Sequence, residues 1–111
     1  MVSPIVIAER IVFWENFLIK NNQFIYLKKI NELLKNYKEV LVEGYGLSTV
    51  VESETKKMSE DFQYAYEFMA KNHNSTEFGK FIKECYKIWE KNNFKDNNEV
   101  FDYIYKNKPK Y

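Results

Sequence analysis

Residues 74–91 read NSTEFGKFIKECYKIWEK, and this stretch carries the clearest helical signal in the chain. Asn74 and Glu77 resemble a capping box, in which the first side chain caps the helix and the second reaches back to it. The apolar residues that follow recur every three or four positions, as along the buried face of an amphipathic helix: Phe78, Phe81, Ile82, Cys85, Ile88 and Trp89. The stretch therefore predicts a core helix that ends near Lys91.

Four further helices are predicted from apolar stripes at helical spacing. Their approximate bounds are 3–20, 23–42, 48–72 with a break near Ser53 or Ser59, and 96–107. Ser3-Pro4 is a typical helix start, and residues 96–99 resemble a second cap, led by Asp96. Residues 108–111 are expected to be a frayed tail. The pattern predicts an all-α fold, a compact bundle of about five helices in a single domain over residues 1–111.

Residues 39–52 leave one alternative open. Valine residues on both sides of Gly44-Tyr45-Gly46 would suit a small β-hairpin. In the helical interpretation, Leu41 extends the stripe of the second helix and Gly44 serves as its C-cap. We prefer the helix because Val40 and Leu41 remain in phase with that stripe.

The composition is that of a folded domain. The 111 residues include nine Tyr, nine Phe and two Trp, and the net charge is +1. Disordered chains have few aromatic residues and a large net charge, so disorder is excluded. The abundance of Lys, Asn, Tyr, Phe and Ile is typical of AT-rich coding sequences, which suggests a low-GC microbe, or a virus or mobile element of one, as the source.

The same sequence predicts a cytoplasmic protein. Glu9 and Arg10 interrupt the first apolar run, so no signal peptide is expected. No stretch has the roughly 18 uncharged residues that a membrane span needs, so we expect no membrane partner. Cys85 is the only cysteine and cannot form an internal disulfide, which fits a reducing compartment.

No residues point to catalysis, a cofactor or a metal. His73, the only histidine, lies in a polar stretch and is expected in a surface loop. Cys85 lies on an apolar helix face, where a thiol is usually buried and unreactive. One His and one Cys cannot form a zinc site. We therefore expect a protein that is not an enzyme.

Three aromatic residues are candidates for contact with a protein partner, because each lies among polar neighbours at helical spacing: Phe13, Tyr64 and Tyr103. Aromatic side chains with a polar rim are favoured at protein interfaces. The first helix is also apolar around most of its circumference, so several neighbours or a second copy of the chain must cover it. Four of its residues are expected to be deeply buried: Ile7, Ile11, Trp14 and Leu18.

A stripe of four lysines on the fourth helix is the candidate anion-binding surface: Lys80, Lys83, Lys87 and Lys91. Such a stripe could meet phosphates and would make the protein a small DNA-binding regulator. However, Glu84 and Glu90 flank it, and it contains no Arg, the residue that most often reads bases. The leading interpretation is therefore a non-enzymatic protein–protein interaction module, such as an inhibitor, an immunity factor or an adaptor.

Overall fold

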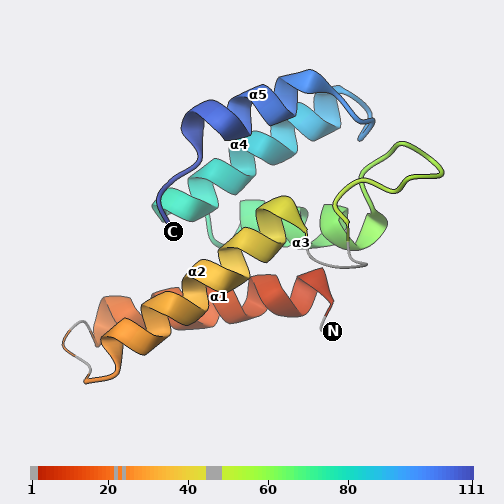
Figure 1. The fold of residues 1–111 in the computed structure, drawn as a ribbon. Coiled ribbons are helices and arrows are strands. Elements are labelled where there is room, and N and C mark those ends of the chain that lie inside the picture. Colours follow the sequence, from red (N-terminus) through yellow and green to blue (C-terminus); the bar gives the residue numbers. More distant parts are fainter. Residues whose placement is uncertain (1–2, 22, 24, 45–48) are drawn as a thin grey trace.

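The computed structural model describes residues 3–21, 23, 25–44 and 49–111. These residues form five α-helices and no strand beyond two isolated β-bridges (Figure 1). The helices are α1 (Pro4–Lys20), α2 (Leu27–Glu43), α3 (Glu60–Asn72), α4 (Glu77–Lys91) and α5 (Asn98–Asn107). The predicted all-α bundle is confirmed. Within the described ranges, no helix is long and apolar enough to cross a membrane.

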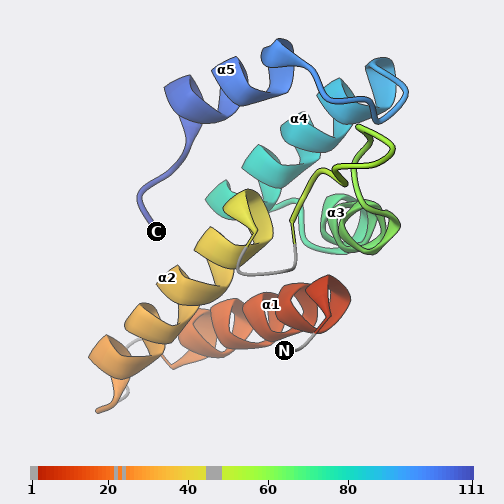
Figure 2. The ribbon, with the colours of Figure 1, turned by 45° about the vertical axis from the view of Figure 1, so that its right-hand side comes forward.

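The helices pack in a chain of neighbours. α1 lies between α2 and α3, α4 packs against α3, and α5 packs against α4 (Figure 2). The end of the α1–α2 hairpin that carries its turn extends away from the other three helices in both ribbon views. This projection contributes to the elongated shape of the molecule, which measures 45 × 27 × 23 Å.

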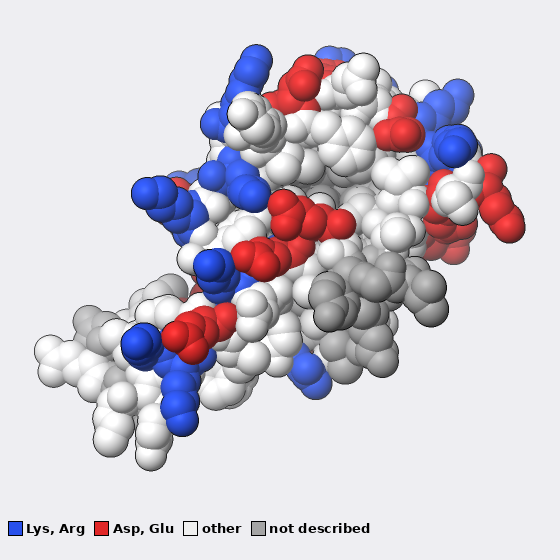
Figure 3. All heavy atoms as spheres, viewed as in Figure 1, with Lys and Arg blue, Asp and Glu red and all other residues white. Residues whose placement is uncertain are grey.

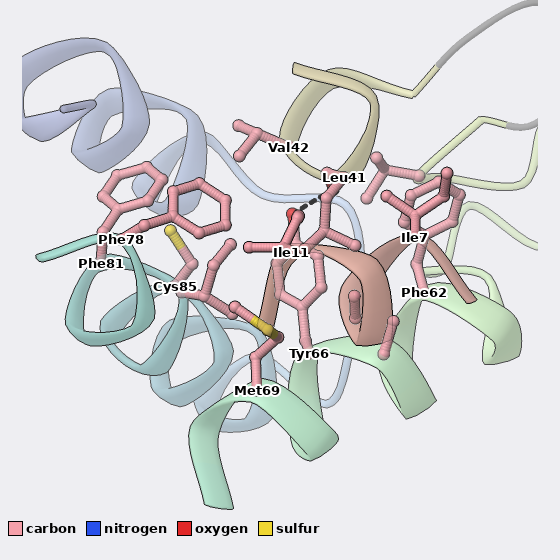
Figure 4. Packing of buried hydrophobic residues seen from close by; sticks show 14 of the residues in the cluster. Ile7, Ile11, Leu41, Val42, Phe62, Tyr66, Met69, Phe78, Phe81 and Cys85 are labelled. Atoms are coloured by element: carbon pink, nitrogen blue, oxygen red, sulfur yellow. Dashed lines mark hydrogen bonds between the residues drawn. The ribbon is translucent and has the colours of Figure 1, made fainter. Parts of the chain in front are cut away.

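Buried side chains from all five helices form one cluster, part of which is drawn in Figure 4. Tyr66 lies inside it, and its hydroxyl donates a hydrogen bond of 2.8 Å to the backbone oxygen of Leu41. Ile7 and Ile11 of α1 are buried as predicted. Trp14 and Leu18 are only half-buried, so that part of the prediction was wrong: the later turns of α1 project with α2 beyond the other helices.

Residues 49–59 fold back on themselves and contact the turn that precedes α5. One antiparallel bridge joins Val51 to Met58, and a second joins Lys57 to Lys95. The segment, which connects α2 to α3 in the chain, is therefore held in part by pairing with a residue distant in the sequence.

The third helix is shorter than the sequence predicted. It was expected from about Ser48 but begins at Glu60, next to the break expected at Ser59. The backbone N–H of Ser59 donates to the carbonyl oxygen of Val50 at 2.7 Å. This long-range pairing replaces the hydrogen bonds that a continuous helix would make.

Gly44 ends α2, as predicted. Its φ of 77° is readily adopted only by glycine, and its N–H donates to the carbonyl oxygen of Val40 at 2.8 Å. Because residues 39–43 are helical, the alternative hairpin over residues 39–52 is wrong. Residues 45–48 of that range lie outside the described residues.

The cap of α4 is Thr76 and not Asn74. The Thr76 hydroxyl accepts a hydrogen bond of 3.0 Å from the N–H of Gly79. Asn74 instead donates from its side chain to the carbonyl oxygen of Ala70, at the end of α3. In the short link between the two helices, Asn74 therefore hydrogen-bonds to the end of α3 and Thr76 to the start of α4.

The cap of α5 also lies later than predicted, by one residue. Asn97 is the cap, and its side-chain oxygen accepts a hydrogen bond of 2.8 Å from the N–H of Val100. The expected cap, Asp96, lies one residue too early for its side chain to reach that N–H.

Candidate interaction site

An apolar groove of about 630 Å³ lies between the C-terminal end of α2, residues 49–51 and α5. We call it the α2–α5 groove. Its lining comprises Val42, Val50, Val51, Phe101, Ile104 and Tyr105, with Glu43, Thr49 and Lys108 as its polar members. On the face shown in Figure 3, uncharged surface extends between α5 and the upper end of α2, with charged groups beside it. The volume is in the range of pockets that bind ligands in other proteins.

The α5 side of the groove presents two exposed aromatic residues. Phe101 is 43% exposed and Tyr105 is 90% exposed. Their spacing of four residues places them one above the other on the helix surface. Phe101 also contacts Trp89 edge to face, with ring centroids 6.0 Å apart, so the helix that carries both rings is anchored to α4. We refer to this pair as the Phe101–Tyr105 ridge.

The C-terminal tail is docked beside the groove, and the prediction of a frayed tail was wrong. Lys108 Nζ lies 3.2 Å from a carboxylate oxygen of Glu43 and 5.5 Å from the ring centroid of Tyr111. The Tyr111 ring in turn meets Phe78 edge to face at 6.0 Å. The tail therefore connects the end of α5 with α2 and the start of α4.

Tyr103 does not lie on an exposed surface. Its ring stacks on Phe81 with centroids 5.9 Å apart and an angle of 19° between the planes, and the residue is half-buried. Tyr103 was expected to be exposed because its neighbours at helical spacing are polar, but it faces α4, as does the fully buried Val100. Phe101 is 43% exposed and lines the groove.

Phe13 and Tyr64 are exposed, at 60% and 71% respectively. They do not form one surface. Tyr64 lines a shallow hollow with Ile5, near the start of α1. Phe13 lies eight residues further along α1, roughly 12 Å away at the rise of an α-helix. The hollow beside Tyr64 is smaller than the α2–α5 groove, at about 260 Å³ against about 630 Å³.

The four lysines of the predicted anion-binding stripe differ in their surroundings. Lys80 is exposed and Lys83 is half-buried. The other two lie near carboxylates, Lys87 at 3.2 Å from Glu84 and Lys91 at 2.8 Å from Glu99. Exposed pairs of this kind add little stability, but the carboxylates reduce the positive potential that a phosphate would meet.

A polar cluster that the sequence did not predict lies where α1, α2 and the α3–α4 link meet. His73 Nε2 lies 2.7 Å from one oxygen of Glu15, and Lys38 Nζ lies 2.9 Å from the other. Thr76 donates a longer hydrogen bond of 3.5 Å to the same carboxylate. His73 lies in the link between α3 and α4, as predicted, but it is only 4% exposed, so its predicted exposure at the surface was wrong.

The cluster holds Glu15 as a carboxylate. Burial alone would raise the pKa of Glu15, but hydrogen bonds from His73 and Lys38 more than offset this effect and lower the pKa. Lys38 also lies over the Phe78 ring, 5.2 Å from its centroid. A carboxylate–imidazole pair occurs in acid–base catalysis, but here both carboxylate oxygens are occupied and the side chains are largely shielded. The arrangement stabilises a junction between helices.

Cys85 is buried, as predicted, and burial raises the pKa of its thiol to about 12. A thiol in this environment is a poor nucleophile. Among the residues that the structure describes, no three His, Cys, Asp or Glu side chains come together as a group that could hold a metal ion.

No protein-family model, curated protein or solved structure matches this chain. Functional inference therefore depends on the surfaces of the chain itself, and we base it on the α2–α5 groove.

Proposed function

We propose that this protein is a non-enzymatic protein–protein interaction module and that its α2–α5 groove binds an amphipathic helix of a partner protein. The observation that carries the proposal is the apolar groove with the exposed Phe101–Tyr105 ridge at its side. Water in contact with these apolar surfaces is unfavourable, and a bound partner would release it.

The shape of the surface favours a helical partner. Two residues at i and i+4 form the kind of ridge that packs against the ridges and grooves of a second helix. Beside that ridge, the groove is lined by Val42 and Val50, which are almost fully buried, and by the half-buried Val51. An amphipathic helix with apolar residues at i, i+4 and i+7 would cover both.

The DNA-binding alternative has less support, because Lys87 and Lys91 both lie close to carboxylates. The narrower roles of inhibitor, immunity factor or adaptor remain predictions, as do the cytoplasmic location and a dimer formed through α1.

A peptide-display selection tests the proposal. Helical peptides with apolar residues at i, i+4 and i+7 are selected on the immobilised wild-type protein, and their affinities are then measured for Tyr105→Glu and Tyr64→Glu. Both tyrosines are largely exposed, so both variants should fold. Loss of an interface aromatic residue should weaken binding to Tyr105→Glu at least about tenfold and leave Tyr64→Glu unaffected. Failure to enrich any peptide, or equal binding to both variants, would contradict the proposal.

A further inference from the structure

The projecting end of the α1–α2 hairpin carries exposed aliphatic side chains. Ile19, in the last turn of α1, is 67% exposed, and Ile25, just before α2, is 82% exposed. In both ribbon views this end lies away from α3, α4 and α5, so no other helix of the chain covers it. A large exposed aliphatic residue at the extremity of a fold contributes nothing to its core.

The same end is cationic. Lys20, Lys28 and Lys29 are exposed, and the sequence from Asn16 to Asn31 contains no acidic residue. Among the described residues, none of these lysines lies within ion-pair distance of a carboxylate; Lys29 Nζ instead lies 5.9 Å from the ring centroid of Tyr26. This contrasts with the lysines of α4, two of which have carboxylate neighbours. We define the hairpin-tip surface as Ile19, Lys20, Ile25, Lys28 and Lys29.

We propose that the hairpin-tip surface binds the surface of an anionic lipid bilayer. Aliphatic side chains at a projecting tip can enter the boundary between headgroups and acyl chains, while the lysine ammonium groups remain among the phosphates. Lysines near an anionic leaflet are attracted to its negative potential. A contact with the bilayer surface needs no membrane-spanning helix.

Other partners match the hairpin-tip surface less well. A nucleic acid would neutralise the lysines but leave Ile19 and Ile25 in water. A protein interface would bury the two isoleucines and the 54% exposed Tyr26, but lysine is depleted at such interfaces, and three of the residues here are lysines. An anionic bilayer would bury the aliphatic side chains and attract the lysine ammonium groups.

Vesicle flotation tests the proposal. The full chain is mixed with vesicles of phosphatidylserine and phosphatidylcholine in equal parts, or of phosphatidylcholine alone. Binding is expected only to the anionic vesicles. It should weaken as salt rises from about 0.01 M to about 0.15 M, which shortens the Debye length from about 30 Å to about 8 Å.

Three variants locate the contact. Lys28→Glu/Lys29→Glu should weaken binding to anionic vesicles about tenfold or more, since it reverses two of the three lysine charges. Ile25→Asn should do so as well, since it removes the more exposed of the two isoleucines. Tyr64→Ser, at an exposed aromatic residue elsewhere, should bind like the wild type. Circular dichroism confirms that each variant is folded, which is expected at exposed positions.

Other outcomes would overturn the proposal. The proposal is wrong if the folded wild type does not float with anionic vesicles. It is also wrong if neither tip variant weakens the binding. Tighter binding to duplex DNA that depends on the lysines but not on Ile25 would assign the surface to a nucleic acid. A dimer in light scattering that Ile25→Asn dissociates would assign it to a second copy of the chain.

Discussion

His73 Nε2 lies 2.7 Å from the Glu15 carboxylate, which joins the α3–α4 link to α1 across 58 residues of sequence. Lys38 of α2 contacts the other carboxylate oxygen at 2.9 Å. One side chain thus connects three parts of the fold. Thr76, the cap of α4, also donates to this carboxylate at 3.5 Å, so the contact ties the start of α4 to α1.

Stability should depend on the ionisation of Glu15. Its pKa is lowered from the ordinary value of 4.5, so the carboxylate adds stability above pH 4.5, and this contribution disappears as the pH falls through the lowered pKa. Glu15→Gln should cost about 2 kcal/mol at neutral pH and unfold with a weaker pH dependence below 4.5. Urea unfolding at several pH values measures both effects.

Glu67→Gln provides the matched control for this variant. Glu67 forms an exposed ion pair of 2.6 Å with Lys71, and such pairs contribute little to stability. Its unfolding should follow the wild type at every pH. If both variants lose the same stability, the buried cluster has no special role.

Gly79→Ala should destabilise the protein although alanine favours helices. A Cβ atom at residue 79 would overlap the backbone oxygen of His73, which cannot move without displacing the α3–α4 link. Overpacking of this kind costs about 1–3 kcal/mol. Thermal unfolding measures the loss. Lys80→Ala, at an exposed position of the same helix turn, is the control and should change stability by less than about 0.5 kcal/mol.

Two neighbouring residues of α1 should respond very differently to truncation. Ile11 is fully buried and Phe13 is 60% exposed. Ile11→Ala should cost about 2–5 kcal/mol because it leaves a cavity, whereas Phe13→Ala should cost less than about 1 kcal/mol. Denaturant unfolding compares the two variants. Equal losses would mean that Phe13 is part of the core.

Cys85 should react slowly with thiol reagents in the native protein. Its pKa of about 12 leaves almost no thiolate at neutral pH, and its side chain is buried. Labelling followed by mass spectrometry should be slow in buffer and become fast in denaturant. Fast labelling of the folded protein would instead show an accessible and activated thiol.

The elements best predicted from the sequence are those decided by local patterns. α4 has a regular apolar stripe, and the helix ends at Lys91 in both the prediction and the structure. The start of α3 was missed because residues 49–59 are held by pairing with Lys95 and Phe94, which are distant in the sequence. Local periodicity carries no information on such contacts.

The candidate site was predicted less well, for a similar reason. His73 was read as exposed because its neighbours are polar, but its partner Glu15 is on another helix. The groove depends on the rotation of α5 against α4, which places Tyr103 inside and Phe101 outside. The spacing of Val100, Tyr103 and Ile104 was a signal for that rotation, since these residues recur at three and four positions.

The most direct test of the proposed function is to map the bound peptide on the protein by NMR. Amide chemical shifts of the labelled protein are followed during titration with a peptide from the display selection. We predict that the largest changes fall at residues 42–43, 49–51 and 101–108, which form the α2–α5 groove. Changes centred instead on Phe13, on Tyr64 or on the lysines of α4 would contradict the assignment of the groove as the binding site.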